Sequence, residues 1–197
     1  VPRPRVAAII GAGNVAMDAA RTARRLGARE VHIVYRRSRE EVPARAEEVE
    51  HAEEEGIIFD FLSLPVAFGG EGGRLTSMTI QRQQLGEPDD RGRRRPEPIE
   101  GSEYEMPCDL AIMAIGQSPN PLVTNTTPDL ATSRRGTIVA DEETGRTNLE
   151  GVFAGGDVVT GQATVILAMG AGRKAAASID EWLRTGVWVP EAEAEGE

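Results

Sequence analysis

A glycine-rich turn between an apolar strand and an amphipathic helix constrains this chain more than any other feature. The run VAAII at Val6–Ile10 predicts a strand covered on both faces, as in a parallel sheet. The sequence GAGNVA follows, and helical periodicity then extends from Asn14 to Leu26, with Val15, Ala19, Ala23 and Leu26 on one face. A second strand is predicted at Val31–Tyr35, which makes the segment a βαβ unit.

The small residues of the turn indicate a dinucleotide site. Gly11 permits the tight turn, Gly13 lets a pyrophosphate approach the backbone, and Ala16 allows close packing of helix on strand. The helix begins at Asn14. In its first turn, at Asn14 and Val15, free N–H groups and the positive end of the helix dipole favour a diphosphate. The alternative is a degenerate domain that keeps the turn and binds no ligand.

Two arginines follow the second strand. An acidic residue at this place would bind the ribose 2′-hydroxyl of NAD, whereas Arg36 and Arg37 can chelate a 2′-phosphate. The pair therefore predicts NADP(H) as the cofactor. The alternative is a solvated basic loop in which the arginines pair with Glu40 and Glu41.

Composition excludes several classes of partner. The net charge of −10 disfavours nucleic acid, and the acidic end at 191–197 is expected to be disordered. No apolar run approaches the roughly 18 residues of a membrane helix, and no signal-peptide pattern opens the chain, so we expect a cytoplasmic protein. The single cysteine, Cys108, precedes an apolar strand and is expected to be buried. His32 and His51 are too scattered to form a metal site.

The remaining pattern predicts an α/β fold with a parallel sheet and an antiparallel β-meander. Gly116 ends the last strand of the parallel sheet, at the carboxyl edge where ligands of such sheets bind. The expected elements are a helix at Pro43–Glu55, strands at Ile57–Leu62 and Leu75–Gln81 around a turn at 69–73, a surface loop at 86–103, a buried strand at Leu110–Gly116, short strands at Thr137–Ala140 and Gly151–Ala154, and a helix at Ala163–Leu183.

The motifs as a set resemble a known family. GAGNVAMDAARTARRLGA, VYRR, GEPDDRGRRRPEPIEGSE and GVFAGGDVVTGQATVILAMGAGRKAA look like the small (beta) subunit of NADPH-dependent glutamate synthase. They are also similar to the NADPH:ferredoxin oxidoreductase large subunits and to the flavin-containing part of dihydropyrimidine dehydrogenase. The resemblance covers nearly all of residues 5–184.

The resemblance implies a flavoprotein in which an NADP(H)-binding Rossmann-like domain is inserted into an FAD-binding domain. Residues 1–120 would be the first domain, and residues 121–190 the C-terminal portion of the second. Gly156 and Asp157 would lie beside the FAD ribityl-pyrophosphate, with a capping role as the alternative for Asp157. The helix that begins near Ala163 and Thr164 would point its N-terminus at the flavin pyrimidine ring. Related reductases place a glutamate near the nicotinamide, which would be Glu47 or Glu48 here.

Parts of the family pattern do not occur in this sequence, namely the cysteine-rich iron–sulfur motifs and the FAD domain's own glycine fingerprint. We therefore expect this chain to contain only part of an FAD site. The expected partners are the missing N-terminal FAD/iron–sulfur region or subunit and a large glutamate synthase-type subunit. The expected function is the NADPH-binding part of an oxidoreductase passing hydride from NADPH to FAD, inactive alone, with no catalytic residue assigned. The alternatives are a split NADP-binding module that completes a flavin site with a partner chain, and an interaction domain with a vestigial fold. Exposed apolar surface on the unpaired flavin-domain tail predicts a homo-oligomer.

Overall fold

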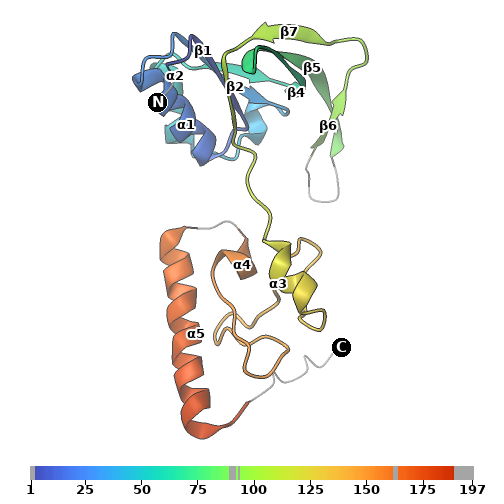
Figure 1. Ribbon diagram of the computed structural model, residues 1–197. Coiled ribbons are helices and arrows are strands. Elements are labelled where there is room, and N and C mark those ends of the chain that lie inside the picture. The colour runs from blue at the N-terminus through green and yellow to red at the C-terminus, as the bar shows by residue number, and fades with distance from the viewer. Residues whose placement is uncertain (1–2, 89–91, 93, 162–163, 189–197) are drawn as a thin grey trace. The chain divides into compact units, whose positions relative to one another are not determined.

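The computed structural model describes residues 3–88, 92, 94–161 and 164–188 (Figure 1). The chain forms two compact units, Val1–Gly116 and Gln117–Glu197. The acidic segment 191–197, expected to be disordered, and Ala163, expected to bind FAD, lie outside the described residues.

The first unit is built on a parallel sheet with strand order β3-β2-β1-β8. Its strands are β1 (Val6–Ile10), β2 (Glu30–Tyr35), β3 (Ile58–Phe61) and β8 (Leu110–Met113). Ile9 of β1 lies opposite Ile33 of β2 on one side and Ile112 of β8 on the other. β1 is thus an inner strand, which explains why its sequence is apolar at every position.

Two helices cover one face of this sheet (Figure 1). They are α1 (Asn14–Arg25) and α2 (Ala46–Glu54), with the short 3-10 helix η1 (Arg39–Glu41) before α2. Ile9 and Ile33 point to this face and are fully buried against Met17 of α1, while Val49 of α2 joins the same cluster. The βαβ unit predicted from the sequence is therefore present.

An antiparallel sheet covers the opposite face of the parallel sheet. It contains β4 (Ser63–Glu71), β5 (Arg74–Pro88), β6 (Arg94–Pro98) and β7 (Tyr104–Pro107). Met78 and Ile80 of β5 are fully buried against Ala8 and Val34 of the parallel sheet. Cys108 belongs to this second cluster, and burial raises the pKa of its thiol, as expected for a structural cysteine.

Three local expectations for the first unit are wrong. The second helix begins at Ala46 rather than at Pro43. Residues 86–88 and 94–98, expected to lie in the surface loop at 86–103, instead belong to β5 and β6, because backbone pairing continues where side chains show no strand pattern. The strand expected at Leu110–Gly116 ends at Met113, whose side chain is exposed because β8 lies at the edge of the sheet.

The second unit contains α3 (Pro121–Thr126), α4 (Asp157–Thr160) and α5 (Val165–Thr185). Phe153, Trp182 and Trp188 form an aromatic cluster in which the rings of Phe153 and Trp188 meet edge to face, with centroids 5.2 Å apart. The strands expected at Thr137–Ala140 and Gly151–Ala154 appear only as single bridges, Thr132 to Ile138 and Arg146 to Phe153.

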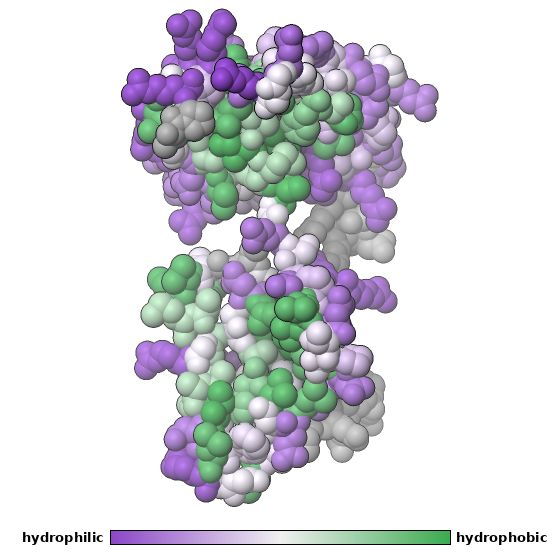
Figure 2. All heavy atoms as spheres, in the orientation of Figure 1, coloured by the Kyte–Doolittle hydropathy of each residue, from purple (hydrophilic) through white to green (hydrophobic). Residues whose placement is uncertain are grey.

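Helix α5 exposes much of its apolar surface. Ile166 is 80% exposed and Leu183 is 71% exposed. Figure 2 shows hydrophobic side chains along the outside of this helix. Among the helices of the described residues, none is long and apolar enough to cross a membrane.

Candidate dinucleotide site

The turn after β1 is held against the neighbouring strands. The Gly11 N–H donates to the Val34 carbonyl oxygen at 3.0 Å, and the Ala114 N–H donates to the Ile10 carbonyl oxygen at 2.8 Å. Gly11 has φ +124°, and a Cβ on it would lie 2.3 Å from the Ala114 carbonyl oxygen. Glycine is therefore required here by the fold itself.

Gly13 differs from Gly11 in its surroundings. It is the N-cap of α1 with φ −81°, which any residue can adopt, and its carbonyl oxygen accepts from the Met17 N–H at 3.1 Å. A Cβ on Gly13 would meet no protein atom within 4 Å. The space above the backbone is thus open at the N-terminus of a 12-residue helix, which fits the close approach of a pyrophosphate.

Arg36 and Arg37 follow β2 at the same carboxyl edge of the sheet. Arg36 is exposed, and the buried Nε of Arg37 has no hydrogen-bond partner. Within the described part of the chain, neither guanidinium forms an ion pair, and the carboxylates of Glu40 and Glu41 both hydrogen bond to Ser38. The structure therefore does not contain the arginine–glutamate pairing that was the alternative to phosphate binding.

The other residues of the first unit that were expected near the cofactor lie in different surroundings. Gly116 has φ +85° and is exposed three residues beyond β8, close in sequence to Ala114, which contacts the Gly11 turn. Glu48, a candidate for the nicotinamide, is engaged by Arg21, with 2.8 Å between carboxylate oxygen and guanidinium nitrogen. Glu47 is exposed.

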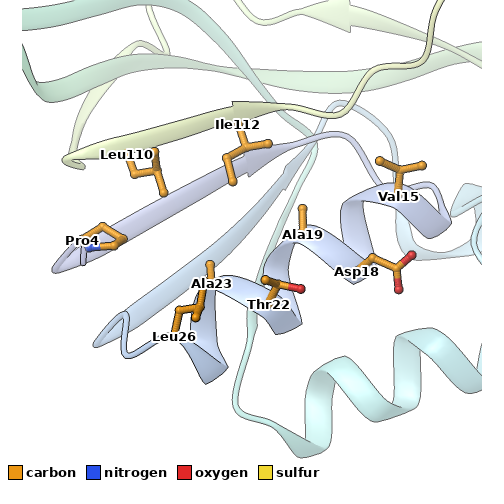
Figure 3. A pocket seen from close by; sticks show the side chains of 9 residues that line it. All are labelled: Pro4, Val15, Asp18, Ala19, Thr22, Ala23, Leu26, Leu110 and Ile112. Carbon is orange, nitrogen blue, oxygen red and sulfur yellow. The ribbon is translucent and has the colours of Figure 1, made fainter. Parts of the chain in front are cut away.

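An apolar groove of about 390 Å³ lies between α1 and the open face of β8 (Figure 3). The residues of α1 that line it include Val15, Ala19, Ala23 and Leu26. These residues form the apolar face that the helical periodicity indicated, and Val15 within it is 71% exposed. The sheet buries Ala16, Met17 and Ala20 together with Ala23, so the buried face of α1 shares Ala23 with the predicted stripe and leaves Val15 outside it.

In the second unit, α4 and the start of α5 meet. Gly156 is the N-cap of α4 with φ +77°, and Asp157 is the first residue of that helix. Thr164 caps α5, its hydroxyl oxygen accepting from the Leu167 N–H at 3.4 Å. Asp157 and Thr164 line one pocket of about 340 Å³ with Val165, Ala168 and Met169. The structure thus brings together two of the residues expected to contact FAD.

Comparison with known proteins identifies the family. Residues 2–175 match the sequence profile described as pyridine nucleotide-disulphide oxidoreductase. The chain belongs to this family.

Its curated relatives are longer proteins. The chain is 50% identical to the NADP(+)-dependent formate dehydrogenase subunit beta of Moorella thermoacetica, over 97% of this chain and 27% of the relative. It is 41% identical to the glutamate synthase [NADPH] small chain of Azospirillum brasilense, over 94% of this chain and 39% of the relative. The resemblance to glutamate synthase small subunits is therefore confirmed, although the chain spans well under half of either relative.

A solved oxidoreductase shares the fold. The thioredoxin reductase of T. acidophilum matches with a TM-score of 0.73 and 24% identity, over 91% of this chain and 53% of that one. The predicted α/β class, with parallel and antiparallel sheets, is confirmed by this match and by the strands themselves. The family uses the expected cofactor classes, NADPH and FAD.

Two structural features of the site in this family member were not predicted. Ser38 and Glu41 form a capping box around η1, and the S-x-x-E spacing was a readable signal for it. Asn14 accepts a hydrogen bond from the backbone N–H of Arg45 at 3.0 Å. Nothing local in the sequence indicates that contact, because the residues are 31 positions apart.

Proposed function

We propose that this chain is the NADP(H)-binding part of a flavoprotein oxidoreductase that passes hydride from NADPH to FAD. The observation that carries the proposal is the convergence of an open helix N-terminus at Gly13 with Arg36 and Arg37 on one edge of the sheet. A dinucleotide with a 2′-phosphate carries negative charge at two places, and the edge offers a positive group for each.

Each cationic or dipolar group has a separate task. The turn at Gly13 and the first amides of α1, at Asn14 and Val15, would hold the pyrophosphate. Arg36 and Arg37 would hold the 2′-phosphate, and the Nε of Arg37 is already desolvated without a protein partner. Gly116 would border the ligand at the end of β8.

The second unit would contact FAD. Gly156 and Asp157 would lie at the ribityl-pyrophosphate, and Thr164 at the start of α5 would direct that helix's N-terminus toward the flavin. The positive end of a 21-residue helix favours the negative charge that a flavin gains on reduction. Bound together, the cofactors would supply hydride transfer from nicotinamide to flavin, while the protein positions them.

The remainder of the flavin site would come from the part of the protein that the relatives have in addition. We propose a region or subunit with the FAD fingerprint and iron–sulfur motifs as partner, and a large glutamate synthase-type subunit beyond it. The chain by itself would then bind NADP(H) without turning it over. Its single cysteine is buried, so the disulphide chemistry in the family's description is not assigned to this chain.

Calorimetric titration with NADP⁺ and, separately, with NAD⁺ tests the proposal. We expect NADP⁺ to bind at least about tenfold more tightly than NAD⁺, because only the former can engage both arginines. Absence of binding by either nucleotide would overturn the cofactor assignment. Equal binding of both would keep the dinucleotide site and remove the role of Arg36 and Arg37.

The same geometry suits a split module that completes a flavin site only with a partner chain. The specific observation in its favour is the exposed apolar surface of α5 beside the pocket at Asp157 and Thr164. Absorbance of the purified chain at flavin wavelengths, before and after addition of FAD, measures what this unit holds by itself. Stable retention of FAD by this chain alone would contradict the need for a partner.

A further inference from the structure

One hydrogen bond joins two segments that would contact opposite parts of the ligand. Asn14, the first residue of α1, lies in the turn proposed to bind the pyrophosphate. Its side-chain oxygen accepts from the backbone N–H of Arg45, which is the N-cap of α2. Residue 45 ends the segment 36–45, which begins with the two arginines proposed to bind the 2′-phosphate.

Further contacts hold the first half of segment 36–45. The Arg37 carbonyl oxygen accepts from the Leu62 N–H at 3.0 Å, and the Glu41 carbonyl oxygen accepts from the Tyr35 hydroxyl at 2.8 Å. The capping box of Ser38 and Glu41 then makes η1 a rigid turn. The second half runs over the core through partly buried Val42 and Ala44, so the Asn14 contact fixes where this segment ends.

The pyrophosphate turn does not depend on the same contact. Gly11 is held to β2 through Val34, and the Gly13 carbonyl oxygen accepts the first hydrogen bonds of α1 from Ala16 and Met17. Loss of the Asn14 side chain would therefore leave this turn formed. It would release the segment with the arginines from its attachment to α1.

We propose that Asn14 is a positioning residue for nucleotide selectivity: it holds segment 36–45 against the pyrophosphate turn, so that Arg36 and Arg37 are preorganised for a 2′-phosphate. This inference rests on the proposed function. A group fixed before binding loses less conformational entropy when the ligand arrives. This preorganisation raises the affinity for NADP⁺, which engages the arginines, and not the affinity for NAD⁺, which lacks the phosphate.

The test compares Asn14→Ala with Asn14→Asp in the full 197-residue chain. Alanine removes the acceptor, and we expect the NADP⁺ affinity to fall about fivefold more than the NAD⁺ affinity. Aspartate keeps an acceptor for the Arg45 N–H and places a negative charge beside the pyrophosphate. We expect this variant to weaken the affinities for NADP⁺ and NAD⁺ in parallel and to preserve the ratio of the two affinities.

Adenosine 2′,5′-bisphosphate and ADP provide a second pair of probes, because they differ in the 2′-phosphate and lack the nicotinamide half. The alanine variant should lose affinity for the first more than for the second. A purely structural role would lower the thermal midpoint and both affinities together, and an unchanged ratio would overturn the inference. If the unaltered chain binds neither nucleotide, the proposed function itself fails, so the two failures are distinguishable.

Discussion

Gly11 and Ala114 meet so closely at the carboxyl edge of the parallel sheet that a Cβ on Gly11 would lie 2.3 Å from the Ala114 carbonyl oxygen. Two residues along, Gly13 has no protein atom within 4 Å of the same position. The two glycines of one motif thus serve different purposes, because the first is required by the packing of β1 against β8 and the second leaves room for a ligand.

Substitution of each glycine by alanine separates these purposes. Gly11→Ala should lower the free energy of unfolding by roughly 2–4 kcal/mol, because of the steric contact and the positive φ. Gly13→Ala should cost about 1 kcal/mol or less, as an N-cap change, yet weaken NADP⁺ binding about tenfold or more. Urea unfolding and calorimetry measure the two effects. A Gly13→Ala variant that binds as well as the unaltered chain would contradict the pyrophosphate assignment.

Arg37 offers a test of nucleotide choice. Arg37→Gln should weaken the affinity for NADP⁺ by about ten- to a hundredfold and change the affinity for NAD⁺ by less than about twofold, because only the 2′-phosphate contact is lost. The matched control is Arg29→Gln, which removes the same charge from the exposed turn before β2, at the other end of the strand. A similar loss in both variants would indicate a general effect of charge rather than a phosphate contact.

The contact between His32 and Asp60 should make the stability of the fold depend on pH. Its Nδ1 lies 2.7 Å from a carboxylate oxygen of Asp60, and this hydrogen bond raises the pKa of His32. The folded state therefore favours the protonated ring. The contribution of this contact to the free energy of unfolding is complete below the unfolded pKa of about 6.5. It is lost as the pH rises through the pKa of His32 in the folded state. Urea unfolding between about pH 5 and 8 should show this decline, and His32→Gln should abolish it.

The exposed surface of α5 predicts self-association. Sedimentation equilibrium at increasing concentration should show a mass above that of a monomer, because apolar side chains along the helix gain by leaving water. Replacement of Ile166 and Leu183, which are 80% and 71% exposed, by glutamate should restore the monomer. The exposed Arg173, replaced by glutamate, is the control for added negative charge. A monomer at all concentrations would contradict this prediction.

The sequence predicts the βαβ unit well because its signals are local. The apolar run of β1, the glycines of the turn and the arginines after β2 each act through neighbouring residues. β1 has the bounds that the sequence indicated, and α1 begins at Asn14 as expected. The convergence of Gly13 with Arg36 follows from parallel pairing of β1 with β2, which the βαβ pattern implies.

Contacts between distant residues could not be predicted in the same way. Periodicity indicated the face of α1 that carries Val15, and only the approach of the sheet decides that Met17 rather than Val15 is buried. β6 contains proline and arginine and is a strand because β5 supplies its hydrogen bonds. The link from Asn14 to Arg45 depends on where two helices begin, which requires the folded unit.

The position of β1 between β2 and β8 has a consequence for the timing of deuterium uptake. Amides of an inner strand reach solvent only when a neighbouring strand detaches, so those of Ala8 and Ile9 should be among the last to exchange. β6 pairs with β5 at the end of a hairpin and should exchange by fraying. Uptake at β1 therefore measures the opening of the first unit as a whole, and slower uptake there with NADP⁺ would report ligand binding as added global stability.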